Sequence, residues 1–474
     1  MLFERVDTTT LGNAFDIFRL ASKPVSSKTK DIVQPLSHLR SAFSDYIRTK
    51  VEEIVKDKTK DDQMIERLLQ VKSGMDQISS EAFKRDSDFA ATQRDAFAWG
   101  INRRDNKPPE LVAKHLDALL KSGNKTMTDS ELETALNDSL VLFRFTKDKD
   151  MFEEFYTRHF AKRLLLNKSA SSDAEMSMLL KLKEECGPDF TRKLETMLKD
   201  ISLSDDIMKA WESFETKARS NGEIPYEFDL SVNVLTQAHW PTYEQHDLIV
   251  PAEMASAIDA FNTFYQGRNS GRKLHWQHSL GSNTIVAQLP KAGAKELLVS
   301  TYQAVVLMLF NAIETGKTLS YKEIQAAVGL DEAELKRTLQ SLACGQIPTR
   351  VLRKHPQGKD VEEGDAFSVN ENLKNERLRI RINMIQQQIS VQEQKDTEQR
   401  VLIDRDLVLQ AAAVRVLKSK KEIKHSDLTN EVIEQIKGRF TIEAKELKKC
   451  FEQLLDKEYM ERVEGQRGMY RYVA

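Results

Sequence analysis

Apolar residues recur at intervals of three and four through most of the chain between residues 34 and 200. This spacing places them on one face of an α-helix, so it favours a succession of amphipathic helices. The breaks between them are short and include Lys107–Pro108–Pro109 and Gly187–Pro188, and Thr128 to Glu131 supplies helix-capping residues. We predict an all-α region with helices at 34–56, 61–79, 81–100, 109–122, 129–145, 149–166, 171–186 and 188–200.

Near residue 221 the helical spacing gives way to alternation. Apolar and polar residues alternate through 228–234, which is the period of a β-strand. Residues 272–290 have the pattern of a hairpin with a turn at 280–282, and 295–311 begins as a strand and continues as an apolar helix. We therefore expect a small β-sheet, whose edges could accept a strand from another protein.

Two later stretches share one layout of three helices followed by two strands, which is the layout of a winged helix. The first has helices expected at 302–311, 321–328 and 332–342 and strands at 350–354 and 366–369. The second has helices expected at 401–418, 427–438 and 442–456 and strands at 458–463 and 469–473, with a turn at 465–468. Ser320 and Asp331 are expected helix caps, and the charged, glutamine-rich segment 375–400 is expected to bridge the two units as a helix.

One lysine, Lys418, stands at the last turn of the helix predicted for 401–418. Ile403, Leu407, Ala411 and Val414 form an apolar stripe on this helix, and Lys418 falls on the same stripe one turn further on. Its methylenes can lie along the apolar edge while its amine projects into solvent. From spacing alone, a lysine that complements a helix C-terminus in a solvated basic face is the competing interpretation.

Composition limits the classes of protein that fit. A length of 474 residues suggests about three domains, and a net charge of −2 argues against a general affinity for nucleic acid. The three cysteines, Cys186, Cys344 and Cys450, lie far apart without a C-x-x-C pair, so no disulfide framework or zinc site is expected. The N-terminal residues lack the apolar segment of a signal peptide, which favours a reducing intracellular compartment.

Direct DNA binding by the last winged helix is an alternative function. The basic residues that could contact DNA are Lys445, Lys448, Lys449, Arg462, Arg467 and Arg471. The acidic residues on the same helix that oppose such contacts are Glu443, Glu446, Glu452 and Asp456. The near-neutral whole chain also weighs against nucleic acid as a partner.

Ordered strings along the chain resemble the cullin family. They are the run beginning FRFTKDKDMFEEFYTRHFAKRLL at 143–208, LTQAHWPTY at 235–243, FYQGRNSGRKLHWQHSLG at 264–281, LQSLACG at 339–345 and AVRVLKSKK at 413–421. The chain is similar to the C-terminal two-thirds of a cullin, most closely of the type-four branch. This resemblance implies a mainly α fold with a smaller α+β part.

The resemblance also implies four domains. They are the last helical cullin repeat of a truncated stalk at 1–105, a four-helix-bundle-like region at 106–220, an α/β cullin homology domain with the first winged helix and a connecting helix at 221–395, and the C-terminal winged helix at 396–474. Because the resemblance begins inside the stalk, it leaves open whether the β-propeller adaptor of the type-four branch can bind.

Cullins are non-catalytic scaffolds of multisubunit RING-type ubiquitin ligases, so the resemblance implies that role for this chain. The string Arg415–Val416–Leu417–Lys418 matches the family's neddylation motif, in which the lysine receives a ubiquitin-like modifier through an isopeptide bond. The chain then needs no cofactor, while the catalytic cysteine and the zinc belong to partners. Ala413, Leu417 and Ser419 depart from the usual motif, which leaves an unmodified structural adaptor as an alternative.

The implied partners are a RING-box protein, the modifier, a ubiquitin-conjugating enzyme, a deneddylase signalosome and a cullin-associated exchange factor, in the nucleus and cytoplasm and without a membrane. The RING-box protein is expected to add a strand among residues 226–235 and 272–289. Candidate contacts are Val232, Val234, Leu274 and Trp276. The alternative is that these four side chains only fill the intramolecular core.

Overall fold

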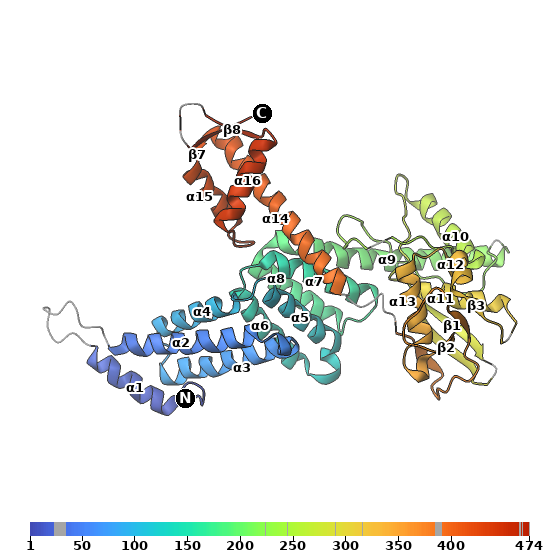
Figure 1. Cartoon of the computed structure of the whole chain (residues 1–474), viewed down its shortest axis with the longest axis horizontal. Helices are drawn as coiled ribbons and strands as arrows, with labels where there is room; N and C mark the ends of the chain where they lie inside the picture. Colours follow the sequence, from blue (N-terminus) through green and yellow to red (C-terminus); the bar gives the residue numbers. More distant parts are fainter. Residues whose placement is uncertain are drawn as a thin grey trace. The chain divides into compact units, whose positions relative to one another are not determined.

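The structure is a computed structural model (Figure 1). The chain divides into two compact units. The structure describes residues 1–22, 35–222, 224–243, 245–289, 291–314, 316–383, 391–463, 466 and 468–473, with the backbone alone at 122–126 and 391–394. The first unit comprises Met1–Arg163, Lys168–Thr191 and Gln392–Ala474, and the second comprises Leu164–Asn167 and Arg192–Val391. In the described part of the chain, no helix has the length and apolar character needed to cross a membrane.

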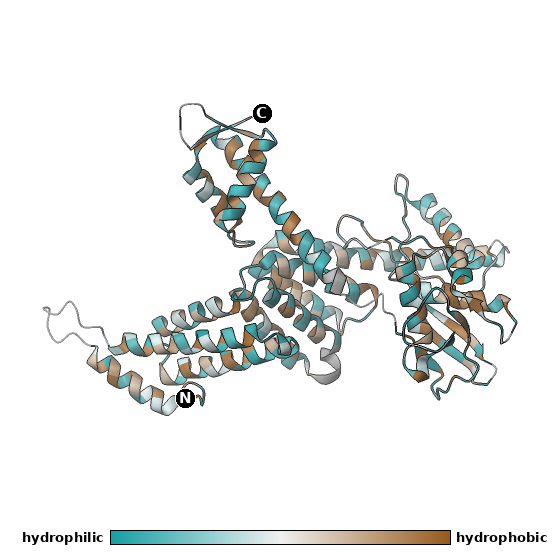
Figure 2. Cartoon of the chain, viewed as in Figure 1, coloured by the Kyte–Doolittle hydropathy of each residue, from teal (hydrophilic) through white to brown (hydrophobic). Residues whose placement is uncertain are grey.

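The first unit begins with a long run of helices, as the three- and four-residue spacing predicts. They are α1 (Thr8–Ala21), α2 (Pro35–Lys56), α3 (Met64–Gln77), α4 (Ser87–Ile101), α5 (Lys107–Thr126), α6 (Asp129–Phe145), α7 (Lys149–Leu165), α8 (Ser172–Cys186) and the start of α9 (Pro188–Ser220). Two short turns accompany α3, the 3-10 helix η1 (Lys58–Gln63) and the π-helical η2 (Ile78–Ala82). Hydrophobic and hydrophilic residues mix along each helix (Figure 2), as in amphipathic helices.

Four phenylalanines form the core of the first helices. Phe15, Phe43, Phe83 and Phe89 are each 1% exposed or less, and the rings of Phe83 and Phe89 lie 4.3 Å apart. A Cβ atom at Gly100 would lie 2.6 Å from the side chain of Val51, so glycine is required where α4 crosses α2. These contacts pack α1, α2 and α4 into one helical bundle.

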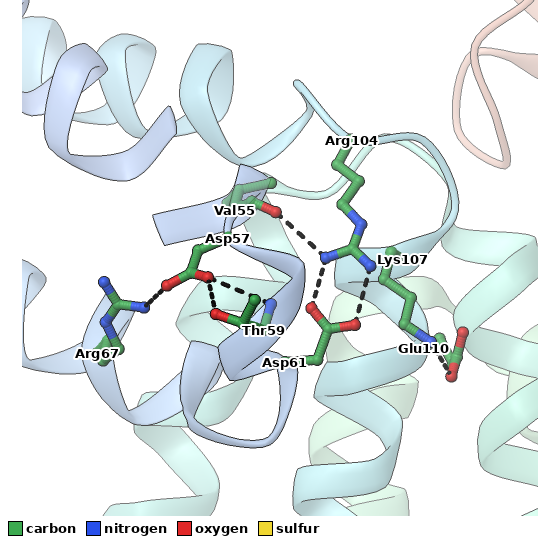
Figure 3. Close-up of polar contacts among 8 residues, drawn as sticks. All are labelled: Val55, Asp57, Thr59, Asp61, Arg67, Arg104, Lys107 and Glu110. Atoms are coloured by element: carbon green, nitrogen blue, oxygen red, sulfur yellow. Dashed lines mark hydrogen bonds and ion pairs between the residues drawn. The ribbon is translucent and has the colours of Figure 1, made fainter. Parts of the chain in front are cut away.

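A polar cluster joins this bundle to the following helices within the first unit (Figure 3). The Arg104 guanidinium donates to both carboxylate oxygens of Asp61, at 2.6 and 2.9 Å, and to the carbonyl of Val55 at 3.3 Å. Arg67 pairs with Asp57 at 3.0 Å, and Lys107 pairs with the buried Glu110 at the start of α5. The turn after α2 is therefore fixed to the segment that enters α5.

A buried ion cluster holds α5, α7 and α8 together. Arg163 is 0% exposed and donates to both oxygens of Glu175, at 2.7 and 2.9 Å, and to Asp117 at 2.7 Å. Lys121 pairs with Asp117 at 2.5 Å, and His159 lies 3.3 Å from the same carboxylate. Burial alone would raise the pKa of Asp117, but the hydrogen bond and charge of His159 with the two cations lower it well below its usual range.

The second unit contains most of α9, the helix α10 (Ala252–Arg268) and a three-stranded sheet. The sheet order is β1 (Ser282–Leu289), β2 (Gly293–Ser300) and β6 (Arg379–Arg381), with β1 antiparallel and β6 parallel to β2. The apolar helix α11 (Thr301–Leu309) follows β2 directly, as predicted, with the Ser300 side chain as its cap. The other short element here is η3 (Phe310–Ala312).

The strand predictions for this unit need two corrections. Residues 228–234 form no strand and belong to no sheet, because side chains of α9 accept the N–H groups of Val232 and Val234 in place of a second strand. The hairpin predicted for 272–290 is wrong, since its turn lies between β1 and β2 rather than at 280–282. A turn does occur just before β1, with the N–H of Gly281 bonded to the carbonyl of His278 at 3.1 Å, but residues 272–278 form no strand that pairs with β1.

Both predicted winged helices are present, with the same strand order. The first contains β3 (Leu319–Ser320), α12 (Tyr321–Val328), α13 (Glu332–Ala343), η4 (Ile347–Thr349), β4 (Leu352–His355) and β5 (Ala366–Val369), in the sheet order β3-β5-β4. The second contains α14 (Val391–Lys420), β7 (Glu422–Lys424), α15 (His425–Ile436), α16 (Ala444–Asp456), β8 (Met460–Arg462) and β9 (Met469–Tyr472), in the order β7-β9-β8. Ser320 and Asp331 cap α12 and α13 as predicted.

The bridging helix predicted for 375–400 is wrong over its first part. Residues 379–381 form β6, because Ile380 turns inward beside Leu297 of β2. Residues 384–390 lie outside the described part of the chain. From Val391 onward the helix is present and is continuous with the helix that carries Lys418.

Candidate functional site

Lys418 lies in the last turn of α14, and its side chain is exposed. Its Nζ is 5.8 Å from the centre of the Tyr472 ring on β9. The aromatic ring attracts the ammonium group by a cation–π interaction, which is weak at an exposed site. The amine is therefore accessible and is directed along the end of the winged helix.

The end of α14 is fixed by backbone hydrogen bonds. Lys421 has a left-handed φ of 65°, and its N–H donates to the carbonyl of Leu417 at 2.8 Å. The N–H of Tyr472 donates to the carbonyl of Lys421 at 2.9 Å. The last turn that carries Lys418 is thus bonded to the last strand of the same domain.

The apolar stripe predicted for α14 faces solvent at Ile403, Leu407 and Ala411, so that part of the prediction is wrong, and only Val414 packs partly against the core. Ile403 is 61% exposed and Leu407 is 56% exposed. The face that packs against α15 and α16 is made of Leu409, Ala412, Ala413, Val416 and Leu417. These residues form a second apolar stripe, whose members also recur at intervals of three and four residues. The small side chains of its two alanines allow the helices to approach closely, so this stripe forms the core.

The structure divides the string Arg415–Val416–Leu417–Lys418 between core and surface. Val416 is 1% exposed and Leu417 is 0% exposed, whereas Arg415 and Lys418 are exposed. Arg415 and Lys418 are three residues apart, so they lie one turn apart on the same side of the helix. The two apolar residues therefore anchor the turn, and the two cations form its outer surface.

Neighbouring lysines differ from Lys418 in their contacts. Lys420 pairs with Glu431 at 3.1 Å. The Nζ of Lys421 lies 5.7 Å from the centre of the same Tyr472 ring. Lys421 differs from Lys418 in its backbone, which is left-handed and follows the last turn of the helix. In the described part of the chain, Lys418 has no ion pair. Its amine is thus less restrained than that of Lys420.

A second set of contacts attaches α14 to α7 within the first unit. Arg405 donates to both oxygens of Asp150, at 2.5 and 2.7 Å, and to Asp148 at 3.0 Å. Burial raises the pKa of Asp148, and the Arg405 guanidinium opposes that rise. The Arg405 side chain also lies 5.0 Å from the Phe440 ring, and Lys149 donates its N–H to the carbonyl of Arg439. The C-terminal winged helix is thereby held against the N-terminus of α7.

We predict that Arg405→Ala loosens this attachment. The change leaves two half-buried carboxylates without their counter-charge, which costs about 2–4 kcal/mol locally. Hydrogen exchange should accelerate in residues 401–409 and at the start of α7. The control Arg415→Ala, on the exposed face of the same helix, should leave exchange unchanged, and equal exchange in both variants would contradict the prediction.

Two extended segments of the second unit pack on one aromatic cluster. The cluster consists of Trp211, Phe261, Phe264 and Tyr265 on α9 and α10. The four side chains predicted as RING-box contacts, Val232, Val234, Leu274 and Trp276, all pack partly buried against it. The structure thus brings the side chains of these four residues together on the aromatic cluster, where they are partly buried.

The first of these segments has one bonded edge and one open edge. The N–H of Val232 donates to the Met208 sulfur at 3.3 Å, and that of Val234 donates to Ser204 Oγ at 2.8 Å. Among the residues that the structure describes, the N–H groups of Ser231 and Asn233 have no hydrogen-bond partner. Bonded and unbonded N–H groups thus alternate along residues 231–234, and we call the side of Ser231 and Asn233 the open edge.

The second segment, residues 273–276, is open as well. No backbone partner for these residues is present in the described ranges. Its side chains alternate, since Lys273 and His275 are exposed while Leu274 and Trp276 are half-buried. Trp276 is fixed by a hydrogen bond from its Nε1 to Asn262 at 3.0 Å.

Three family models match the chain in order. The cullin alpha solenoid domain matches residues 26–208, the cullin alpha+beta domain matches 234–373, and the cullin protein neddylation domain matches 404–466. The chain belongs to the cullin family. Lys418 lies within the range matched by the neddylation domain.

Similar curated proteins point to the cullin-4 type. Cullin-4A of Mus musculus is 45% identical over 432 residues, and Cullin-4A of Homo sapiens is 44% identical, each over 91% of this chain and 55% of the relative. Cullin-3A of Arabidopsis thaliana is 36% identical over 98% of this chain and 61% of its own length. This cullin therefore spans a little over half the length of the relatives it matches.

The cysteines of this cullin are poor nucleophiles. Burial raises the pKa of Cys186 to about 11 and that of Cys450 to about 12, and it also raises the pKa of Cys344. All three are free thiols. A thiol with a raised pKa carries little thiolate near neutral pH, so none of the three is suited to forming a thioester.

Sequence reasoning missed several residues that shape these sites. Tyr472 orients the Lys418 turn, Arg405 holds α14, and Ser204 and Met208 occupy the inner edge of the extended segment. Arg405 and Asp150 are 255 residues apart, and no local spacing links them. The only local signal is the pair of aspartates, Asp148 and Asp150, on either side of Lys149.

Proposed function

We propose that this cullin is a scaffold subunit of a cullin-RING ubiquitin ligase, regulated by neddylation at Lys418. Its second unit would bind a RING-box protein, which would recruit a ubiquitin-conjugating enzyme. The chain would promote transfer by holding the enzyme near a bound substrate, which raises the effective concentration of the acceptor. The observation that carries the proposal is the open edge at Ser231 and Asn233.

Strand addition explains why this edge suits a partner. The inner N–H groups at Val232 and Val234 are occupied by α9, so the segment is held straight without a neighbouring strand. A partner strand could then use the outer N–H and C=O groups of Ser231 and Asn233, which otherwise face solvent. This edge would be supported by four partly buried side chains that pack on the aromatic cluster, Val232, Val234, Leu274 and Trp276. The atoms of these side chains that remain exposed would contact the partner.

Proline substitutions test this proposal. The double variant Ser231→Pro, Asn233→Pro removes the two outer N–H donors and leaves the bonds of Val232 and Val234 to α9. Two lost main-chain hydrogen bonds should weaken binding of a co-expressed RING-box protein about 10- to 100-fold, as measured by titration calorimetry.

The matched control is Ser231→Ala, Asn233→Ala, which keeps both N–H groups. Its affinity should stay within about threefold of the wild type. Thermal unfolding of both variants would show that the fold is retained. Wild-type affinity in a folded proline variant would refute strand addition at this edge.

Lys418 would act as a switch on the assembled ligase. Attachment of a ubiquitin-like modifier would add a bulky domain to the end of α14 and shift the C-terminal winged helix, a movable lid on the RING, towards an open state. A deneddylase signalosome, which would remove the modifier, and a cullin-associated exchange factor would be further partners. Binding of a β-propeller adaptor is left open, because the resemblance to cullins begins inside the stalk.

We propose that the chain itself is not an enzyme. The raised pKa values of its three thiols support this, because a thioester-forming ligase needs an activated cysteine. The catalytic cysteine would come from the conjugating enzyme and the zinc from the RING-box protein. No group of three or more potential metal ligands occurs within the described ranges.

Two remaining proposals concern nucleic acid and location. Arg471 pairs with Glu422 at 2.7 Å and with Glu461 at 3.3 Å, so part of the basic wing is neutralised, which argues against DNA binding. Arg467 lies outside the described residues. The free thiols support work in a reducing compartment, and we propose the nucleus and cytoplasm.

A further inference from the structure

A surface groove of about 600 Å³ lies between α9 and α10 in the second unit. Both helices are labelled in Figure 1. Its volume falls within the range of about 300–1,000 Å³ that is typical of ligand pockets. The groove is separate from the open edge at Ser231 and Asn233 and from Lys418, since none of these residues lines it.

Two phenylalanines provide the apolar surface of the groove. Phe264 is 7% exposed, whereas Phe214 is 39% exposed, and their ring centres lie 5.3 Å apart. Trp211 lies 5.7 Å from Phe214 and 5.3 Å from Phe264, so it supports both rings from the core. A rigid, partly exposed aromatic pair is the kind of surface into which an apolar side chain of a partner inserts.

Small residues keep the groove open. Ser213 of α9 and Thr263 and Gly267 of α10 line it. A Cβ atom added at Gly267 would meet no other atom within 4 Å, so the space beside this glycine is open. A larger side chain at Gly267 would therefore fill the groove without a clash with the fold. Such a substitution should also be tolerated by α10, because glycine is the least favourable non-proline residue for a helix.

The charged residues of the lining are both cations. Lys217 and Arg268 are exposed, and neither has an ion pair among the residues that the structure describes. The Arg268 guanidinium lies 5.6 Å from the Phe264 ring centre, over the apolar surface. No aspartate or glutamate lines the groove. Its charge is therefore complementary to an acidic partner.

We propose that this groove docks an acidic amphipathic helix of a partner protein. Apolar side chains at i and i+4 of that helix would contact Phe214 and Phe264, and its flanking carboxylates would pair with Lys217 and Arg268. Two isolated cations beside an aromatic surface suit a peptide better than a nucleic acid, which requires many phosphate contacts. The inference is independent of the ligase proposal.

Fluorescence anisotropy with a defined probe tests the groove. The probe is a fluorescein-labelled synthetic helix with leucines at i, i+4 and i+7 flanked by glutamates, titrated with the full chain. We expect it to bind at least about fivefold more tightly than the same peptide with glutamines in place of glutamates, and less tightly as salt rises. Gly267→Phe should abolish binding, and Lys217→Glu with Arg268→Glu should weaken it about tenfold or more.

The matched control is Lys199→Glu, which reverses an exposed charge on α9 outside the groove. Its affinity for the acidic probe should stay within about twofold of the wild type. Circular dichroism would verify that Gly267→Phe is folded. Equal binding of the acidic and glutamine peptides, or unchanged binding by folded Gly267→Phe, would overturn the proposal.

Discussion

Replacement of Lys418 by arginine is expected to abolish isopeptide attachment of the ubiquitin-like modifier in a reconstituted neddylation reaction. Arginine keeps the charge and the contact with the Tyr472 ring, but its guanidinium stays protonated and cannot act as the acceptor amine. The domain should therefore fold normally while the modified band disappears. Ligase activity should fall to that of the unmodified wild-type complex.

Two neighbouring lysines provide the controls. Lys420→Arg and Lys421→Arg should both retain modification, because Lys420 is paired with Glu431 and Lys421 ends the helix. Peptide mapping by mass spectrometry would locate the modified residue in each variant. Modification that persists unchanged in Lys418→Arg, or that maps to Lys420 in the wild type, would disprove the assignment.

Local signals explain the elements that were predicted well. The helix α12 begins and ends where predicted because Ser320 caps it with Glu323 and because Gly329 takes the left-handed conformation, φ 75°, at its end. The helix α6 begins at the capping box of Thr128 and Glu131. In both cases the atoms that decide the boundary lie within a few residues of it.

Long-range competition explains the elements that were missed. Residues 228–234 have the alternation of a strand, but Ser204 and Met208 on α9 occupy the inner backbone donors, so no ladder forms. On α14 two apolar stripes share one spacing, and only packing against α15 and α16 selects the one with Ala412 and Ala413. Sequence periodicity identifies an apolar face, but it cannot rank two faces of one helix.

The four predicted RING-box contacts illustrate the same limit. The sequence places Val232, Val234, Leu274 and Trp276 on one side of extended segments, and the structure packs all four on the α9–α10 cluster. The residues best placed to bind a strand are instead Ser231 and Asn233, whose polar side chains carry no such signal. Binding by main-chain atoms is not visible in side-chain patterns, because every residue has the same N–H and C=O groups.

The second large effect expected is the loss of stability in Arg163→Ala. Arg163 is fully buried and makes three hydrogen bonds to Glu175 and Asp117, which are 1% and 6% exposed. Removing the guanidinium leaves both carboxylates in the interior without their main counter-charge. Breaking such a buried network costs about 3–5 kcal/mol, which should appear as a lower urea midpoint and as faster hydrogen exchange in α5, α7 and α8.

An exposed pair offers the comparison. Arg40→Ala removes a single bond to Asp88 between side chains that are 42% and 70% exposed, so it should cost less than about 1 kcal/mol. Arg163→Lys should be intermediate, because all the donors of an ammonium are on one nitrogen, whereas the guanidinium reaches the three acceptor oxygens from three separate nitrogens. Similar midpoints for Arg163→Ala and Arg40→Ala would show that the buried cluster contributes little.

The cluster also predicts the direction of the pH dependence. Because the folded state lowers the pKa of Asp117 below the ordinary value of 3.8, folding is favoured by this group at pH values above 3.8. That contribution is lost as the pH falls from 3.8 through the lower folded pKa, since protonation removes the charge that pairs with Arg163, Lys121 and His159. In Arg163→Ala the carboxyl loses a buried counter-ion and burial then dominates, so its folded pKa should rise above the unfolded value and acidification should no longer cost stability at this group. Urea midpoints measured between about pH 3 and pH 7 should therefore fall less on acidification in the variant than in the wild type, and parallel curves for the two proteins would contradict this role of Arg163.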